Sequence, residues 1–473
     1  MTSFDAVVVG AGPAGLAAAI EAATGGARVL LVDEGAQLGG QIYRQLAPGL
    51  RAERGDRLGA DQVASQTLLD ALGRLPVTVW SGAEVWGIFP ERRLAVLHHG
   101  RCTQVEAGAL VLATGAYDRP VAFPGWTLPG VVTAGGTTAL IKSQRILPGR
   151  RVLLAGTGPL LLAAAVGLVR GGAEVVGIAE AGTRTALARL LRRPGVLGKA
   201  LGVMATLQRA GVPTWARHGI VRAEGREGVE RAVIAALDDA WRPVAGTERT
   251  LEVDTVCIGY GLVPSTELAQ LAGCALTYRA GQGGWVPVAD PDRLMATSAP
   301  GVFVAGDGAG VAGSETALEQ GRLAGLGAAL HVGRLGAKAA GARARAPRRR
   351  LDALASFRRS LEAILEPRPG LCERVTDDTV VCRCEEVTGA EIREAIADGA
   401  LSLTEVRAAT RSGMGLCQGR WCSPTVAALV ARWAAGVTPE AAGRLTARPP
   451  VKPIAVRALT DEGADEPTPA ARD

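Results

Sequence analysis

The stretch Val7–Gly15, with the sequence VVVGAGPAG, decides the fold that this chain is expected to adopt. An apolar run typical of a buried parallel strand leads into a turn with Gly10, Gly12 and Gly15 in the spacing G-x-G-x-x-G. In a nucleotide-binding turn the first glycine makes the tight turn, the second lets backbone amides approach a pyrophosphate, and the third lets the helix pack close to the strand. The N-terminus of that helix then faces the anion. The stretch therefore predicts a dinucleotide-binding unit.

The residues after the turn support this interpretation, since a lone glycine pattern is weak evidence in a chain with 63 glycines. A helix is expected over Leu16–Thr24 and a second strand over Arg28–Val32. Asp33 and Glu34 come directly after that strand, where the fingerprint requires a carboxylate for the ribose hydroxyls. Asp33 fits the strand register better, but the spacing leaves open which of the two is used.

A second segment, remote in the sequence, indicates the same cofactor. An apolar strand expected over Gly301–Ala305 leads to Gly306 and Asp307, and small residues then open a helix over Glu315–Val332. A carboxylate at the end of an apolar strand is suited to hold a ribityl hydroxyl, while the dipole of the following helix faces the flavin ring. Because both segments have features that bind parts of the same cofactor, we expect bound FAD.

Two further turns belong to the expected flavin site. One is the Gly-Gly turn before Gln41, which lies against the cofactor in flavoproteins of this build. The other is Thr114–Gly115, where the chain crosses into an inserted domain. The residues predicted to bind the cofactor are Gly10, Gly12, Pro13, Ala14, Gly15, Asp33, Glu34, Gly40, Gln41, Arg44, Thr114, Gly115, Gly306 and Asp307.

The inserted domain repeats the opening pattern with one change. Gly156 and Gly158 occupy the first two glycine positions, Leu161 stands at the third, and a second strand over Ala173–Ile178 ends near Glu180. A buried isobutyl group at this helix–strand contact costs about 1–3 kcal/mol if nothing moves. A change of that size at a phosphate turn would weaken nucleotide binding about tenfold to a hundredfold. The repeat therefore predicts a second dinucleotide fold, and leaves open whether Gly156–Gly158 binds a further nucleotide.

Composition excludes some classes of protein. A chain of 473 residues is too long for one core, and its net charge of +6 comes almost wholly from arginines spread along the sequence. That spread argues against a nucleic-acid partner. The dense run Arg343–Arg350 lies in an alanine-rich stretch and is predicted to be a solvated, loop-like linker.

No segment is expected to be a signal peptide or to span a membrane. The first apolar run lacks a preceding cationic region and already serves as the first strand. The uncharged run Val152–Val169 contains the glycine turn, which does not suit a helix in lipid. We therefore expect a cytoplasmic protein, either free or peripheral to the inner face of the membrane. Its eight cysteines then suggest reduced thiols or a metal site.

Four cysteines form a cluster near the C-terminus. Cys382 and Cys384 make a C-x-C pair, and Cys417 and Cys422 make a C-x4-C pair after 32 intervening residues. A set of four thiolates suits zinc or an iron–sulfur cluster. Zinc sites usually show C-x2–4-C pairs, and the short C-x-C pair is easier to reconcile with the two irons of a [2Fe-2S] cluster. We therefore predict [2Fe-2S] on these four residues, with zinc or no metal as the alternatives.

The other reactive side chains form no constellation in the sequence. No C-x-x-C pair lies near the expected flavin, so the dithiol of a disulfide reductase is missing. Adjacent His98 and His99 point to opposite faces of a strand, and His218 and His331 are isolated. We predict no catalytic residue in this chain, because no side chain stands out as the general base for a substrate.

Several motifs together carry a resemblance that spans the chain from the first turn to about residue 453. The chain resembles the large flavoprotein subunits of heteromeric amine dehydrogenases: the A subunit of opine oxidase, the hydrogen cyanide synthase flavoprotein subunit, and the alpha subunits of hydroxyproline and proline dehydrogenases. The C-terminal part is similar to bacterioferritin-associated-ferredoxin-like modules, although these have C-x-x-C as their second pair. The resembling pieces are Gly39–Arg44, Gly156–Leu162, Cys382–Val387, Thr410–Cys422 and Arg448–Pro453.

The resemblance implies a division of labour. In such systems a smaller, D-amino-acid-oxidase-like flavin subunit oxidises the amine, and the large subunit relays electrons through FAD and [2Fe-2S] to an acceptor other than NAD(P). A small ferredoxin-like subunit is a further partner that the resemblance allows. Two alternatives stay open: a stand-alone NAD(P)H-dependent flavin and iron–sulfur reductase, and a zinc-containing module that docks a partner.

The expected fold is α/β, with a disulfide-reductase-like FAD domain, an inserted NAD-type Rossmann domain and a small α-helical [2Fe-2S] domain. The predicted order is 1–117 for the first part of the FAD domain, 118–250 for the inserted domain, 251–335 for the second part of the FAD domain, 336–372 for a linker with one helix around Leu351–Leu365, 373–440 for the [2Fe-2S]-binding domain and 441–473 for a C-terminal tail.

Overall fold

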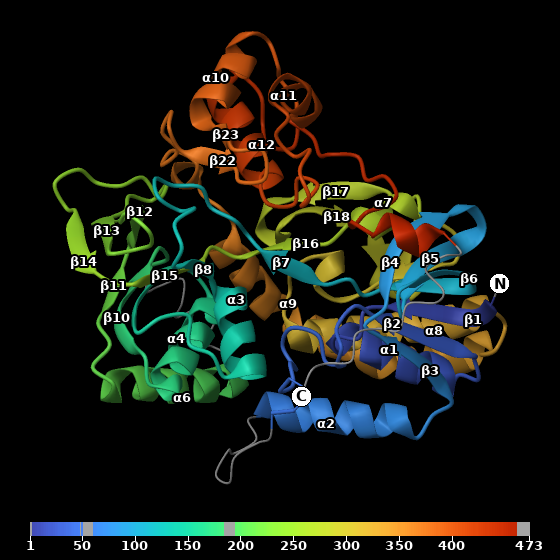
Figure 1. Cartoon of the computed structure of the whole chain (residues 1–473). Helices are drawn as coiled ribbons and strands as arrows, with labels where there is room; N and C mark the ends of the chain where they lie inside the picture. Colours follow the sequence, from blue (N-terminus) through green and yellow to red (C-terminus); the bar gives the residue numbers. More distant parts are fainter. Residues whose placement is uncertain (1, 48, 51–59, 184–193, 461–473) are drawn as a thin grey trace.

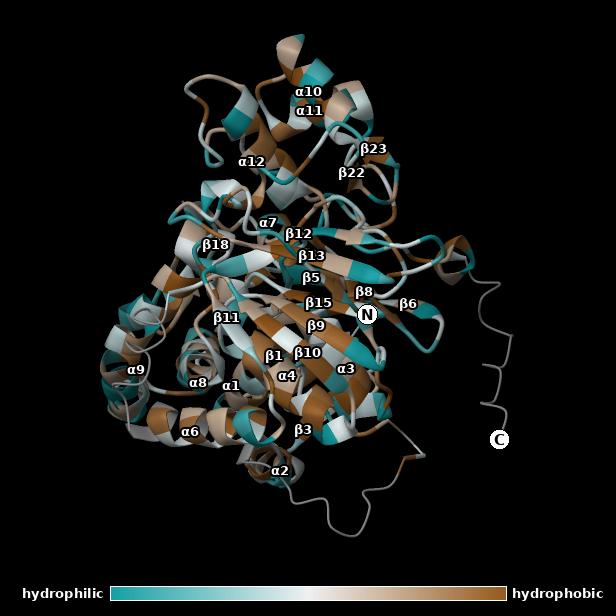
Figure 2. Cartoon of the chain, turned by 90° about the vertical axis from the view of Figure 1, so that its left-hand side faces the viewer, coloured by the Kyte–Doolittle hydropathy of each residue, from teal (hydrophilic) through white to brown (hydrophobic). Residues whose placement is uncertain are grey.

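The structure is a computed structural model that describes residues 2–47, 49–50, 60–183 and 194–460. Two sheet-containing units lie side by side, and a small, mainly helical part sits above both of them (Figure 1). Hydrophobic residues gather in the strands of the sheets, whereas the outer turns are hydrophilic (Figure 2). None of the described helices is both long and apolar enough to cross a membrane.

The first unit is built on a nine-stranded sheet. Its strands follow the order β19 (Ala289–Asp290), β20 (Ala296–Thr297), β21 (Val302–Val304), β6 (Arg101–Leu112), β1 (Thr2–Val9), β2 (Val29–Asp33) and β3 (Val77–Ser81). Strands β4 (Glu84–Phe89) and β5 (Arg93–His98) pair with each other, and β5 also pairs with β6. The five strands from β21 to β3 are parallel, which is the arrangement that the opening stretch predicts.

Two helices of the first unit pack closely on one face of this sheet: α1 (Pro13–Thr24) and α8 (Ser314–His331). Glycines on α8 make the approach possible. A Cβ atom at Gly321 would lie 2.1 Å from the Ala14 carbonyl oxygen, and one at Gly325 would lie 2.3 Å from the Ala18 carbonyl oxygen. The helix after the first turn is therefore held by the helix after Asp307. Helix α2 (Ala60–Gly73) also belongs to this unit.

The second unit has a five-stranded parallel sheet in the order β11 (Thr214–Ala216), β10 (Glu174–Glu180), β9 (Arg151–Gly156), β15 (Thr255–Gly259) and β8 (Val131–Thr133). The helices within its described residues are α3 (Ala134–Ala139), α4 (Pro159–Gly171) and α6 (Pro194–Arg209). An antiparallel sheet of β12 (His218–Glu224), β13 (Arg231–Ala236) and β14 (Arg249–Glu252) adjoins it. This is the second dinucleotide fold that the sequence repeat predicts.

One predicted boundary of the inserted domain is wrong. The second part of the FAD domain is predicted to begin at residue 251, just before the apolar stretch Val253–Tyr260. Strand β15 pairs with both β9 and β8, so it belongs to the second sheet. Hydrophobic pattern alone marks a strand as buried and does not say which sheet it joins.

The two units are joined by a narrow two-stranded ribbon. Strand β7 (Ala116–Asp118) leaves the first unit, and β16 (Leu262–Pro264) returns antiparallel to it. After this ribbon come α7 (Glu267–Leu271) and the hairpin of β17 (Leu276–Arg279) and β18 (Gly284–Pro287). These elements lie under the small upper part in Figure 1.

The predicted loop-like linker is instead part of a long helix. Helix α9 (Ala337–Leu365) contains the whole run Arg343–Arg350, so the predicted helix starts well before Leu351. Pro347 lies inside it, which is why the sequence suggested a break. Tertiary packing overrides that tendency, because Ala340, Ala344 and Leu351 are buried in the core of the first unit.

The arginine run is paired with carboxylates of the first unit and is not merely solvated. Arg343 forms an ion pair with Glu21, and Arg350 Nη1 lies 3.0 Å from Glu319 Oε1. Both bonds fasten α9 across the helices α1 and α8. Charge alternation alone could not have identified these partners, because they are distant in the sequence.

The small upper part holds β22 (Val380–Cys382), β23 (Val387–Thr388), α10 (Gly389–Ala397), α11 (Leu403–Thr410) and α12 (Ser423–Trp433). Thr388 and Glu391 form a capping box at the start of α10. Buried side chains such as Val381 and Val426 join Phe123 and Trp126 of the inserted segment in one continuous core. The small part is therefore packed firmly onto the second unit.

Candidate functional site

The first glycine turn contains two glycines that the protein itself requires. Gly10 has a φ of +99°, and a Cβ atom there would lie 2.3 Å from the Ala113 carbonyl oxygen. A Cβ atom at Gly15 would lie 1.7 Å from the Gly10 carbonyl oxygen. Both distances are far below van der Waals contact, so these glycines permit the strand, the turn and the helix to fit together.

Gly12 is different, because none of the described residues packs against it closely enough to require a glycine. Its φ of −71° is open to any residue, and the nearest atom to an added Cβ is Gly40 Cα at 4.0 Å. The space over Gly12 is bounded by a second backbone turn. The space between the Gly10–Gly15 turn and the Gly39–Gly40 turn is called the cradle below. It lies at the N-terminus of α1, and a glycine at position 12 leaves room there for the close approach of a pyrophosphate.

The Gly39–Gly40 turn forms the other side of this cradle. The Gly39 amide donates to the Ala11 carbonyl oxygen at 2.9 Å. Gly40 has a φ of +61°, and a Cβ atom there would lie 2.7 Å from Gly12 Cα. Arg44 donates to the side chain of Gln41, so both polar residues of this segment lie together.

The two carboxylates after β2 have different surroundings. Asp33 accepts hydrogen bonds from the amides of Ala11 and Gly35, the second at 2.7 Å, and burial raises its pKa. Glu34 points outward and forms an ion pair with Lys452 of the C-terminal tail. Asp33 therefore braces the glycine turn, whereas Glu34 is tied to the tail. The prediction that one of them holds the ribose stays a prediction.

Asp307 lies where the sequence places it, at the start of the segment that leads into α8. Its Oδ1 atom accepts from the amides of Ala312 and Gly313 at 3.0 and 3.3 Å, and burial raises the pKa of this carboxyl group. The Gly306 amide donates to Gln320 Oε1 at 2.9 Å. Among the described residues, no donor reaches Oδ2 of Asp307, so this atom is open to a ligand.

The predicted segments meet around one place. A Cβ atom at Gly306 would lie 2.9 Å from Ala14 Cβ, and one at Gly308 would lie 2.8 Å from Thr114 Oγ1. Thr114 Oγ1 in turn donates to the Ser265 carbonyl oxygen at 2.6 Å. Segments from both ends of the first unit therefore surround the same cradle.

Two residues near this cradle were not predicted from the sequence. Gln320 accepts from the Gly306 amide, and Lys452 pairs with Glu34. The only signal for Gln320 was a polar residue inside an apolar helix. The only signal for Lys452 was its place in the Arg448–Pro453 motif.

The four clustered cysteines lie as two pairs. Cys382 and Cys422 are buried and hydrogen-bonded to each other, and Cys384 and Cys417 are hydrogen-bonded nearer the surface. The hydrogen bond from Cys422 lowers the pKa of Cys382 to about 5 and raises the pKa of Cys422. The Gly413 amide also approaches Cys382 Sγ, at 3.5 Å.

Two pairs of thiols are the ligand set that a two-iron cluster requires. A single tetrahedral zinc needs all four thiolates around one point, whereas a two-iron cluster takes one pair of thiolates on each iron. Gly415 allows the backbone to approach Cys384 closely, because a Cβ atom there would lie 2.3 Å from Cys384 Cβ.

The second glycine turn is packed differently from the first. Leu161, at the third glycine position, is fully buried. It fits because the facing residue at the end of β15 is Gly259, where a Cβ atom would lie 3.2 Å from Leu161 Cδ1. The first unit has the reverse arrangement, with Gly15 on the helix and Ala113 on the strand. At this helix–strand contact the first unit therefore has its glycine on the helix, whereas the second unit has it at the end of the strand.

A side chain also covers this second turn. A Cβ atom at Gly158 would lie 2.9 Å from Leu365 Cδ2, at the end of α9. Glu180, at the end of β10, is buried, accepts from the Gly182 amide at 2.9 Å and has its pKa raised by burial. The turn therefore packs against an apolar side chain at the point where the first turn has an open cradle.

Comparison with known families decides what this architecture is. Residues 4–337 match the model of the pyridine nucleotide-disulphide oxidoreductase family, which covers most of the chain. The chain belongs to this family. Residues 380–432 match the BFD-like [2Fe-2S] binding domain. The protein is a FAD-dependent oxidoreductase with a [2Fe-2S] cluster, and the predicted cofactors and fold class are confirmed.

Individual relatives extend the match over the whole chain. The chain is 35% identical to the A subunit of opine oxidase from Agrobacterium tumefaciens in an alignment of 473 positions that covers 96% of this chain and 91% of the relative. It is 35% identical to hydrogen cyanide synthase subunit HcnB of Pseudomonas aeruginosa, over 88% of this chain and 90% of the relative. The resemblance drawn from the sequence is confirmed.

A solved structure shows the same fold. The L-proline dehydrogenase of P. horikoshii superposes with a TM-score of 0.67, at 22% identity, over 97% of this chain and 80% of that chain. The arrangement of the two dinucleotide-binding units and the cluster domain in the present chain therefore also occurs in another protein.

Proposed function

We propose that this family member is the electron-relaying subunit of a heteromeric dehydrogenase for a secondary amine or amino acid of the hydroxyproline, proline, opine or glycine class. Two observations support the proposal. Relatives that match nearly the whole chain are named as subunits of opine oxidase and hydrogen cyanide synthase. The chain also places a flavin unit and a cluster domain within one packed body.

The FAD is assigned to the cradle of the first unit. The amides of the Gly10–Gly15 turn, with Pro13 and Ala14 in the first turn of α1, would take the pyrophosphate, and Asp33 or Glu34 would take the ribose. Asp307 would accept from the ribityl chain through its open Oδ2 atom. Thr114, Gly115 and Gly306 complete the walls, with Gly40, Gln41 and Arg44 on the opposite side.

We propose that the four cysteines hold the cluster, and the contacts of Cys382 with Cys422 and of Cys384 with Cys417 support this. Cys382 and Cys422 would bind one iron, and Cys384 and Cys417 would bind the other. Each pair joins one cysteine of the C-x-C segment with one of the C-x4-C segment. A flavin takes up electrons in pairs, and a [2Fe-2S] cluster passes them on one at a time.

The observation that carries the relay proposal is the covered second turn. An NAD(P) pyrophosphate would have to reach amides beside Gly158, where Leu365 packs. We therefore propose that the terminal acceptor is not NAD(P), and that the second unit serves the assembly as a packing domain. Its role would be to carry the small cluster part, with which it shares a core.

Oxidation of the amine itself is proposed to occur on a partner. A smaller, D-amino-acid-oxidase-like flavin subunit would deliver electrons to this chain, and a small ferredoxin-like subunit is a further candidate partner. The proposal needs no general base in this chain.

The test compares three purified samples under identical anaerobic conditions: the single chain, the chain co-purified with a D-amino-acid-oxidase-like partner, and that complex with Cys382→Ser. We expect amine-dependent dye reduction only with the partner present, and a strong loss in the third sample. A Cys102→Ser complex is the matched control, since Cys102 lies outside the cluster. Full activity of the single chain would overturn the relay proposal, and rapid reduction of the single chain by NADH would favour the stand-alone reductase.

A further inference from the structure

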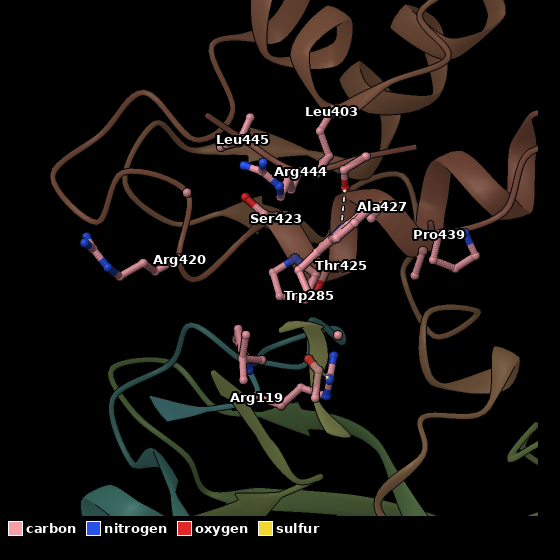
Figure 3. A pocket seen from close by; sticks show the side chains of 18 of the residues that line it. Arg119, Trp285, Leu403, Arg420, Ser423, Thr425, Ala427, Pro439, Arg444 and Leu445 are labelled. Atoms are coloured by element: carbon pink, nitrogen blue, oxygen red, sulfur yellow. Dashed lines mark hydrogen bonds between the residues drawn. The ribbon is translucent and has the colours of Figure 1, made fainter. Parts of the chain in front are cut away.

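A cavity of about 1080 Å³ lies between the first unit and the small upper part (Figure 3). Its lower wall comes from β7, β16 and β18 and includes Arg119 and Trp285. Its upper wall comes from α12 and the tail, and includes Ser423 and Arg444. None of the predicted flavin ligands lines this cavity.

Arg119 has no anionic partner among the described residues. Its Nη2 atom donates to the Gly283 carbonyl oxygen at 2.9 Å, and its Nε atom is buried without a hydrogen-bond partner in the described part of the chain. No described carboxylate forms an ion pair with it, and burial lowers the pKa of the guanidinium. The titratable groups that act on it electrostatically are the phenols of Tyr278 and Tyr117. A buried charge is normally paired, because an uncompensated one is expensive to desolvate.

A second buried arginine shows that lack of an ion pair is not by itself a sign of a ligand. Arg374 also has unpartnered guanidinium nitrogens. However, its guanidinium lies over the Tyr260 ring at 5.4 Å, and a Cβ atom at Gly219 would lie 2.9 Å from Nη2. Arg374 is thus enclosed by protein and does not line the cavity, whereas Arg119 does.

The rest of the cavity wall also favours an anion with an apolar body. Arg444 has no carboxylate partner among the described residues; it donates to Gln270, and its guanidinium lies 5.9 Å from the Trp285 ring centre. The first turn of α12, with Ser423 and Thr425, lines the same space and adds the positive end of a helix dipole. By contrast, Arg420 is neutralised by Glu267 at 2.8 Å.

We propose that this cavity binds a small molecule bearing a carboxylate or phosphate oxyanion. The guanidinium of Arg119, which lines the cavity, donates to the oxyanion, since a planar guanidinium is suited to bind carboxylate and phosphate oxygens. The apolar body of the ligand lies against Trp285. Because the two walls belong to different parts of the chain, the ligand bridges the flavin-binding unit and the cluster-bearing part. This inference does not depend on which amine the assembly oxidises.

The test uses calorimetry on the purified holoprotein, with inorganic phosphate and benzoate as probes and chloride at equal ionic strength as the reference. We expect saturable binding of at least one probe. Arg119→Gln should weaken it about tenfold to a hundredfold, which is the usual loss for a charge-assisted hydrogen bond. Arg368→Gln is the matched control, because Arg368 lines the same cavity but pairs with Glu366 at 3.7 Å. That variant should bind as the wild type does.

Thermal unfolding separates a binding role from a structural one. Without a probe, Arg119→Gln should unfold at or above the wild-type temperature, since it removes a buried unpaired charge, and the probe should raise only the wild-type value. Trp285→Leu provides a second variant, and should weaken benzoate several-fold more than phosphate. Binding of phosphate alone or benzoate alone identifies the class of oxyanion. The proposal is overturned if neither probe binds the wild type, or if Arg119→Gln binds as tightly as the wild type does.

Discussion

Replacing Gly12 with alanine should separate ligand binding from folding at the first glycine turn. In the apoprotein the one described atom within 4 Å of the new Cβ atom is Gly40 Cα, at 4.0 Å, and the φ of −71° suits alanine. We therefore expect the free energy of unfolding of the apoprotein to change by less than about 1 kcal/mol, in the stabilising direction. The same methyl group fills the space through which backbone amides would reach a pyrophosphate.

The expected loss of FAD affinity follows from that overlap. Overpacking by one methyl group typically costs about 1–3 kcal/mol, which corresponds to about tenfold to a hundredfold in the dissociation constant. Gly12→Val should be worse and should yield mainly apoprotein. Flavin content is measured from the visible spectrum of the purified protein, and affinity by titrating FAD into the apoprotein.

Two other glycines provide the comparison. Gly10→Ala should destabilise the apoprotein itself, because Gly10 has a φ of +99° and its added Cβ would lie 2.3 Å from a carbonyl oxygen. Gly73→Ala, at the end of α2 with no atom within 4 Å of the added Cβ, should change neither stability nor flavin content appreciably. The reasoning is refuted if Gly12→Ala binds FAD as tightly as the wild type, or if its apoprotein unfolds as readily as that of Gly10→Ala.

Three further predictions concern the other parts of the chain. Cys384→Ser should lower the iron content measured by metal analysis while FAD stays bound, whereas Cys102→Ser should keep the full iron content; zinc without iron in anaerobically prepared wild type would contradict the cluster ligands. NADH should not bleach the flavin of the wild type under argon. Leu365→Ala should uncover the amides beside Gly158, so this variant should show measurable NADH binding. Tight NADH binding by the wild type would contradict the prediction, because it would show that the turn is already open. Because burial raises the folded pKa of Asp307 above its unfolded value, its contribution to stability is present at low pH and lost as the pH rises through the folded pKa. The Asp307→Asn apoprotein should therefore be more stable than the wild type at neutral pH, and this advantage should shrink as the pH falls, as followed by urea unfolding across the acidic range; a pH-independent difference would contradict the assignment.

The sequence by itself determined the two dinucleotide folds and the two cofactors. A short local pattern predicts each of them. For the nucleotide unit the pattern is a strand, a glycine turn and a helix, and for the cluster it is four cysteines in two close pairs. Such patterns can be recognised in a sequence because residues close together in the chain set the geometry of a turn and the spacing of a pair of metal ligands.

Only the tertiary structure decided which residues face one another across long separations. It showed that Leu161 is accommodated by Gly259 and that Leu365 covers Gly158. It also showed that no described residue packs against Gly12 closely enough to require a glycine, as Ala113 does at Gly10. It also assigned β15 to the second sheet and extended α9 through Pro347, against the local signals. The physical reason is that packing and charge pairing depend on distance in space, and residues remote in the sequence supply most of the neighbours of a buried group. Arg119 illustrates this point, because neither its burial nor its lack of an anionic partner can be inferred from the residues beside it in the chain.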